Sequence, residues 1–248
     1  MSKRGAFIAI EGLDRSGKST QASALIKRLE AANVPCKHIK FPDRTTPIGK
    51  MIDSYLQSKT ELDDHVIHLL FSANRWELAS SIVKALEEGT TVVCDRYAFS
   101  GIAFSAAKVL PRETTSKDGD STIPIPTHVL SYEWCRAPEI SLPAPDLTFL
   151  LEVSPEKAES RGGYGEERYE NKEVQEHVRQ VFDRIGEEIE SSGVGKWVVL
   201  DADLDKDEVE QSVWDEVKPF IEHMGVSGPV RKLWDKTREA AMVDALYI

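Results

Sequence analysis

One segment near the start of the chain restricts the possible folds more than any other: residues 12–19 read GLDRSGKS. The spacing matches GxxxxGK[ST], and the segment lies between a short apolar run, Ala6–Glu11, and a stretch over 20–32 with apolar residues at helical spacing. Glycines let the backbone curl until several N–H groups point inward, and the next helix adds partial positive charge at its N-terminus. The segment therefore predicts a phosphate-binding loop between a first strand and a first helix.

The rest of the chain alternates between strand-like and helix-like segments. Further strands are expected at Cys36–Phe41, Thr91–Cys94, Leu147–Val153 and Trp197–Leu200, and the main helices at 48–56, 62–86, 99–109, 155–161, 172–191 and 207–223. Short apolar strands are typical of a sheet that is buried on both faces, so we expect an α/β fold with a parallel five-stranded sheet and helices on both faces. The 248 residues are expected to form a single domain with an exposed, aperiodic loop near 111–126. A C-terminal extension near 229–248 is expected to be helical from Arg231 onward.

Charge and composition argue against several classes of partner. The formal net charge is −11, which disfavours a broad basic surface for nucleic acid. The three cysteines are odd in number and lack CxxC spacing, so a disulfide framework is not expected. The longest apolar runs are far below the ~20 residues that cross a bilayer. We therefore expect no nucleic-acid or membrane partner and a cytoplasmic or nuclear location.

Several classes of protein share such a phosphate-binding loop. Small GTPases read guanine with Asn-Lys-x-Asp, and the nearest match here, at 171–174, lacks the Asp and does not follow a strand. Arginines at the ends of several strands instead favour a kinase for a small phosphorylated substrate, because the Arg guanidinium binds phosphate bidentately. A nucleotide-binding module without catalytic activity remains an alternative, although such proteins usually lose the loop Lys or Ser, and both are present at Lys18 and Ser19.

Three further segments narrow the class. FPDR at 41–44 follows the second strand, FSANRW at 71–76 lies in the longest helix, and DRYAFSG at 95–101 follows the third strand. With the loop at 12–19, these segments resemble thymidylate kinase, a P-loop nucleoside monophosphate kinase, in its eukaryotic form. The resemblance runs from about Gly5 to Trp234 and fails in the 111–126 loop and after Trp234. It implies a three-layer sandwich of the P-loop NTPase type and ATP-dependent phosphorylation of dTMP to dTDP, a step of dTTP synthesis. Kinases for UMP/CMP, AMP or a deoxynucleoside are the rival interpretation, which FSANRW and DRYAFSG disfavour.

The resemblance also assigns residues to the ATP side of the site. It implies that ATP is bound by loop residues and one arginine: Arg15, Ser16, Gly17, Lys18, Ser19, Thr20 and Arg161. Arg161 would lie against adenine at the start of a mobile lid near 161–170, and Asp201-Ala202 weakly resembles the loop beneath the adenine ring. Ser19 would bind Mg²⁺ directly and Asp95 through water. Catalysis is assigned to Arg15, Lys18, Asp95 and Arg96, while the division of charge between Arg15 and the lid arginines Arg161 and Arg168 stays open.

The dTMP side follows from the same resemblance. Asp14 would contact the sugar 3′-hydroxyl, Arg44 and Arg96 would hold the phosphate, and Tyr97 would leave no room for a 2′-hydroxyl. Phe71 would stack on thymine and Arg75 would donate to its O4, although core packing is a strong alternative for Phe71. Further lining of the dTMP site is expected from Phe41, Pro42, Ser100, Gly101, Phe104 and Tyr169.

The reaction expected from this site is direct in-line transfer of the γ-phosphoryl group, without a covalent enzyme intermediate. No general base is expected, because a phosphate monoester is already largely ionised near neutral pH. The resemblance also implies a homodimer formed through packed helices.

Overall fold

A five-stranded parallel sheet lies at the centre of the computed structural model, which describes residues 3–115, 122–161, 172–222 and 225–235. The sheet order is β3-β4-β2-β7-β8. These strands are β3 (Cys36–Lys40), β4 (Thr91–Asp95), β2 (Phe7–Gly12), β7 (Leu147–Glu152) and β8 (Lys196–Asp201). The α/β fold and the five parallel strands predicted from the sequence are confirmed.

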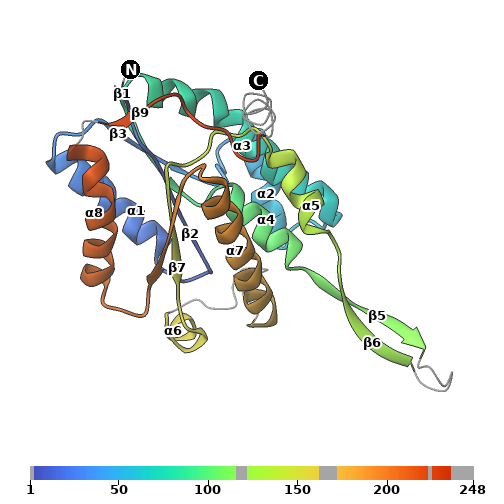
Figure 1. Ribbon diagram of the computed structural model, residues 1–248. Helices are drawn as coiled ribbons and strands as arrows, with labels where there is room; N and C mark the ends of the chain where they lie inside the picture. The colour runs from blue at the N-terminus through green and yellow to red at the C-terminus, as the bar shows by residue number, and fades with distance from the viewer. Residues whose placement is uncertain (1–2, 116–121, 162–171, 223–224, 236–248) are drawn as a thin grey trace, which may run out of the picture.

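Helices cover both faces of this sheet (Figure 1). Helices α1 (Lys18–Ala31) and α8 (Lys206–Glu222) pack together on one face, whereas α3 (Asp64–Glu87), α4 (Ala98–Ala106) and α7 (Lys172–Ser192) cover the other. Helix α2 (Pro47–Leu56) packs against α3, and α5 (Tyr132–Arg136) continues into the short 3₁₀ helix η1 (Ala137–Glu139). The remaining elements are α6 (Pro155–Ser160) and the small antiparallel pair β1 (Lys3–Arg4) and β9 (Val226–Ser227).

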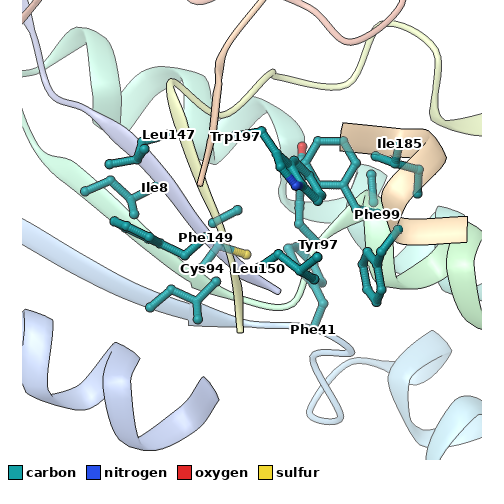
Figure 2. Packing of buried hydrophobic residues seen from close by; sticks show 14 of the residues in the cluster. Ile8, Phe41, Cys94, Tyr97, Phe99, Leu147, Phe149, Leu150, Ile185 and Trp197 are labelled. Atoms are coloured by element: carbon teal, nitrogen blue, oxygen red, sulfur yellow. The ribbon is translucent and has the colours of Figure 1, made fainter. Parts of the chain in front are cut away.

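The central strand of the sheet, β2, lies in the hydrophobic core. Every residue of β2 is buried, as expected for a strand between two helical layers. Aromatic rings fill the core: Phe99 meets Trp197 edge to face at 5.3 Å between ring centroids (Figure 2). Tyr97 meets Phe7 in the same way at 5.1 Å. Tyr97 and Phe99 directly follow β4, so the segment after this strand is anchored in the core.

The segment expected to be an aperiodic loop is instead a β-hairpin. Strands β5 (Val109–Thr115) and β6 (Thr122–His128) pair antiparallel from Val109↔His128 to Thr115↔Thr122 and extend away from the body of the protein (Figure 1). The pairing gives hydrogen-bond partners to a long backbone segment that the core does not cover. Its prolines and the lack of apolar alternation conceal the strands in the sequence. The ladder also begins at Val109, so α4 ends at Ala106 and not at the expected residue 109.

The C-terminal segment also differs from the prediction. Over 231–235 the chain is not helical: Lys232 forms a β-bridge with Pro143 and residues 233–234 form a turn, with Leu233 N donating to Leu142 O at 2.9 Å and Ala144 N to Arg231 O at 2.8 Å. These backbone bonds and the complete burial of Leu233 replace the helical bonds that the pattern predicted. Residues 236–248 lie outside the described part of the chain. No described helix combines the length and hydropathy needed to cross a bilayer.

Candidate active site

The loop between β2 and α1 has the backbone shape of a phosphate-binding loop. Gly12 has φ 142° and Gly17 has φ 94°, both in a region that side chains rarely adopt. A Cβ on Gly12 would also lie 2.4 Å from the carbonyl oxygen of Leu151, so no other residue fits there. Gly17 is the N-cap of α1 and makes no side-chain cap, so the first N–H groups of the helix are left for a ligand.

Lys18 is folded into this loop. Its ammonium group donates to the carbonyl of Leu13 and, at 3.2 Å, to the hydroxyl of Ser16. The residue is only 5% exposed, and burial lowers the pKa of Lys18 to about 7. Phosphate oxygens at this position would provide the negative charge that the buried ammonium lacks.

An acidic side chain lies beside the loop, at the end of β4. The carboxylate of Asp95 accepts a hydrogen bond from Ser19 and forms an ion pair with Lys40 at 3.2 Å. Burial works to raise the pKa of Asp95, but the Ser19 bond and the charge of Lys40 outweigh it, so the pKa is lowered. The second oxygen, Oδ1, is buried without a hydrogen-bond partner among the described residues.

These oxygens fit a hydrated Mg²⁺ ion. Mg²⁺ in nucleotide sites takes one or two protein oxygens and completes its shell with waters and phosphates. Ser19 and Asp95 provide such a set, and the unpartnered Oδ1 is suited to accept from a metal-bound water. The described residues contain no cluster of three or more His, Cys, Asp or Glu that could hold a metal ion.

Arg96 joins the loop to the segment after β4. Its guanidinium donates to the carboxylate of Asp14 and, at 3.2 Å each, to Gly12 O and Ser100 Oγ. The ring of Phe104 lies 5.2 Å from the guanidinium carbon, a cation–π distance. Arg96 has φ 66°, a conformation that is costly for a side-chain-bearing residue and is often found at functional sites.

Asp14 has a second partner from a distant helix. Gln175, near the start of α7, donates to Asp14 Oδ2 at 3.1 Å and accepts from Asp14 N at 3.3 Å. Asp14 is therefore linked to the helix that follows residues 162–171, which lie outside the described part of the chain.

Glu11, the residue before Gly12, holds the segment after β4 in place. It is completely buried and accepts hydrogen bonds from Tyr97 N at 2.9 Å, Ser100 N at 3.1 Å and the Ser100 hydroxyl. Burial is the largest influence on its carboxyl group, and it raises the pKa of Glu11 despite these bonds. The sequence analysis did not assign Glu11 a role. An acidic residue that ends an otherwise apolar strand was the available signal.

A cavity of about 470 Å³ extends from the phosphate loop to the α2, α3 and α4 side of the protein. It brings together nearly all the residues that the sequence predicted, from both substrate groups: Asp14, Arg15, Gly17, Lys18, Ser19, Thr20, Phe41, Pro42, Arg44, Phe71, Arg75, Asp95, Arg96, Tyr97, Ser100, Gly101, Phe104 and Arg161. Lys40 and Leu56 also line it and were missed. Ser16 lies buried behind the loop, outside the lining, and Tyr169 and Arg168 lie outside the described residues.

One part of the cavity lining combines apolar side chains with the buried cation Arg75. Phe71, Phe104 and Leu56 provide the apolar walls, and Phe71 is half-buried between α2 and α3. Arg75 is 2% exposed and forms a buried ion pair with Glu139, which the sequence analysis did not single out. A planar heterocycle with a hydrogen-bond acceptor on its edge suits such a lining.

Three predicted residues contact other parts of the protein. Tyr97 is 1% exposed, and its hydroxyl donates to Pro143 O at 3.0 Å. Arg44, at the exposed rim, forms an ion pair with Asp53 at 2.8 Å. Arg161 donates to Arg15 O at 2.5 Å and to Ala202 O at 2.7 Å, so it connects the phosphate loop to the loop after β8.

Comparison with known proteins agrees with this geometry. The family model described as thymidylate kinase matches residues 10–130 and 127–213. Thymidylate kinase of Schizosaccharomyces pombe is 47% identical over 217 residues, which cover 87% of this chain and 93% of that protein. The Homo sapiens thymidylate kinase is 39% identical, with 86% of this chain and 89% of that protein covered.

A solved structure extends the agreement to the fold. The structure of thymidylate kinase from Candida albicans has a TM-score of 0.77 and 38% sequence identity, covering 94% of this chain and 99% of that chain. The family model covers the motifs that line the cavity, and the sequence relatives and the solved structure are thymidylate kinases as well. This chain belongs to the thymidylate kinase family.

Proposed function

We propose that this protein transfers the γ-phosphoryl group of ATP to dTMP and releases ADP and dTDP, a step in the synthesis of dTTP for DNA replication. One observation carries the proposal: a single cavity contains both the phosphate-binding loop and the part of the lining that includes Phe71 and Arg75. Two phosphorylated substrates can therefore meet within one enclosed space, with Arg15, Lys18 and Arg96 lining it as well.

The proposed mechanism is direct transfer. The loop N–H groups and Lys18 hold the ATP phosphates, while Arg44 and Arg96 hold the phosphate of dTMP, whose oxygen attacks the γ-phosphorus in line. Arg96 must then exchange its ion pair with Asp14 for the phosphate of dTMP. This would leave the carboxylate of Asp14 for the sugar 3′-hydroxyl. Rate enhancement arises from positioning and from cations that neutralise charge in the transition state.

The metal and the base have separate places in this proposal. Ser19, and Asp95 through water, would hold Mg²⁺, which would supply charge neutralisation to the ATP phosphates. Phe71 stacks on thymine and Arg75 donates to its O4, with Tyr97 close to the sugar; Tyr169, which the resemblance also assigns to dTMP, lies outside the described residues. Arg161, bonded to Ala202 O, lies against adenine.

The direct test is product formation with a matched inactive control. Purified protein is incubated with ATP, Mg²⁺ and dTMP, and the products are separated by ion-exchange chromatography. We expect equal amounts of ADP and dTDP from the wild type and none from Lys18→Ala. Binding of both nucleotides without dTDP formation would favour the non-catalytic nucleotide-binding module and contradict the proposal.

We further propose that the protein is a homodimer in the cytoplasm or nucleus. Val66, Leu69 and Trp76 lie along one side of α3 and are 44%, 48% and 43% exposed, an unusual apolar stripe for a surface helix. A second copy of α3 would cover it. Light scattering after size exclusion should give twice the chain mass of 27.7 kDa, and a monomer at micromolar concentration would contradict this part of the proposal.

A further inference from the structure

The ion pair between Arg75 and Glu139 is the most deeply buried charge pair next to the cavity. Arg75 is 2% exposed and Glu139 is 0% exposed. Arg75 Nε donates to Glu139 Oε2 at 2.8 Å, and Nη2 donates to Oε1, so the two planar groups meet as a bidentate fork. Burial alone would lower the pKa of Arg75, but the Glu139 carboxylate outweighs it and the pKa is raised. The guanidinium therefore keeps its charge although it is almost completely buried.

Such a pair is not explained by stability alone. Removing two charges from water costs several kcal/mol per ion, and an apolar pair of similar volume is often at least as stable. A buried fork does, however, fix the orientation of a guanidinium that would otherwise rotate about several bonds. The fork geometry thus suggests that orientation is what Glu139 contributes.

The backbone that carries Glu139 is itself attached to the helix that carries Arg75. Ser72 Oγ donates to Pro138 O at 3.0 Å, and Trp76 Nε1 donates to the same oxygen at 2.8 Å. Trp76 lies one position after Arg75 on α3, and Ser72 lies three positions before it. These two bonds hold η1 against α3, so Glu139 cannot withdraw from Arg75 without breaking them.

The fork leaves one part of the guanidinium for a ligand. The printed bonds of Arg75 all use Nε and Nη2, and no described residue accepts a hydrogen bond from Nη1. Arg75 lines the cavity, and the backbone of Gly101 passes so close that a Cβ there would lie 2.8 Å from Nη1. The cavity therefore meets a fixed cation that can donate hydrogen bonds but cannot accept them.

We propose that Glu139 is a positioning residue for base selection, which fixes the Arg75 guanidinium so that the cavity favours a pyrimidine with a carbonyl at position 4 over one with an amino group there. The inference rests on the proposed function, because it places the base of the acceptor beside Arg75. A 4-amino group would direct its own N–H toward a fixed donor and leave both unpaired, which is how polar sites reject a wrong partner.

The comparison of dUMP with dCMP tests this inference, because the two differ in the hydrogen-bonding pattern of the base edge and not in the 5-methyl group or the sugar. Steady-state kcat and KM are measured for both acceptors with the wild type and with Glu139→Gln. We expect Glu139→Gln to raise the KM for dUMP more than it lowers kcat. The ratio of kcat/KM for dUMP to that for dCMP should fall by about tenfold, the size expected from a lost charged hydrogen bond. A ratio within twofold of wild type would overturn the inference.

Two further variants separate positioning from stability. Glu139→Asp keeps the charge but shortens the side chain, so its ratio should lie between those of the wild type and the Gln variant. If Glu139→Gln does not fold, the Asp variant decides: a ratio reduced by about threefold supports the inference, and a wild-type ratio overturns it. Glu188→Gln is the matched control, since it removes a half-buried carboxylate that pairs with Arg136 outside the cavity. It should lower the melting temperature and leave the ratio unchanged, and an equal loss of ratio there would overturn the inference.

The same assay distinguishes failure of the inference from failure of the proposed function. Wild-type protein that forms no dTDP from dTMP would contradict the function itself. Wild-type protein that forms dTDP, with acceptor ratios unaffected at position 139, would contradict only the role of Glu139.

Discussion

Replacing Arg15 by Gly should remove the cation that we propose acts on the transferring phosphoryl group, while leaving the loop intact. Arg15 lies in the phosphate loop, lines the cavity and has φ 63°. Glycine adopts this conformation without strain, so the substitution changes the side chain and spares the backbone. In related P-loop enzymes, such a cation contributes about 10³–10⁵ in rate. We therefore expect kcat to fall by at least about 10³-fold, equivalent to about 4 kcal/mol of transition-state stabilisation, with little change in dTMP affinity.

Arg161 provides the comparison, since it is the second described arginine that the resemblance assigns to ATP and it contacts the phosphate loop. Its guanidinium already donates to Arg15 O and Ala202 O, which places it between the phosphate loop and the loop after β8. Losing these two charged bonds should loosen the two loops proposed to hold ATP and cost about 1–2 kcal/mol of ATP-binding free energy. Arg161→Ala should therefore raise the KM for ATP by about 5–30-fold and change kcat much less.

Steady-state kinetics of three variants decide between these roles. Arg15→Lys keeps the charge but loses the planar fork, so it should recover only part of the kcat lost in Arg15→Gly. Melting temperatures of all variants should match the wild type within a few degrees. If Arg161→Ala collapses kcat and Arg15→Gly is nearly silent, the catalytic cation belongs to the segment that begins at residue 161, and the assignment to Arg15 is refuted.

Four further predictions follow from individual contacts. Lys18→Ala should abolish turnover, at a cost of about 3–4 kcal/mol or more, with an unchanged melting curve; activity above a tenth of wild type would refute its role. Phe71→Ala should raise the KM for dTMP by an amount equivalent to about 1–3 kcal/mol of lost stacking, whereas early unfolding with an unchanged KM would show that Phe71 is only core. Joining Glu113 to Pro124, which face each other in the hairpin, with an Asn-Gly turn should leave kcat within about twofold of wild type, because the rest of the hairpin keeps its register; a large loss of kcat in a folded variant would show that the hairpin tip acts on the site or on an essential subunit contact. Burial lowers the pKa of His68 from 6.5 to about 4, so between these pH values the unfolded chain binds a proton that the folded chain does not bind. The free energy of unfolding should therefore fall by up to about 3 kcal/mol as pH drops from 6.5 to 4. Chemical denaturation across this range should show a smaller fall for His68→Gln.

The sheet and the phosphate side of the site were predictable from the sequence because their signals are local. Gly12 in the loop at 12–19 has a backbone conformation and a close neighbour that only glycine allows. The strand before the loop, β2, is a short, fully buried and mostly apolar run. Asp95 and Arg96 directly follow a buried strand, so their place at the edge of the sheet needs no knowledge of distant contacts. Residues from the three segments that resemble thymidylate kinase, at 41–44, 71–76 and 95–101, all line the same cavity.

The residues that were missed depend on contacts between segments far apart in the chain. Glu139 meets Arg75 across 64 positions, and it lies in a short 3₁₀ turn without a recognisable pattern. Gln175 reaches Asp14 across 161 positions. The hairpin at 109–128 was missed because its composition resembles that of a loop and its hydrogen bonds join two strands. The segment at 231–235 was missed because its composition resembles that of a helix, whereas its backbone bonds are made to residues 141–144.

The central claim, that this cavity selects dTMP as the phosphoryl acceptor, is tested most directly by one acceptor panel. ADP release is measured with dTMP, dUMP, dCMP, UMP, CMP and AMP at a fixed saturating concentration of MgATP, and kcat/KM is determined for each acceptor. The account predicts the highest value for dTMP, with a fall of at least about tenfold for CMP and AMP, since neither presents a 4-carbonyl to Arg75 and both carry a 2′-hydroxyl. A higher kcat/KM for UMP, CMP or AMP than for dTMP would contradict it.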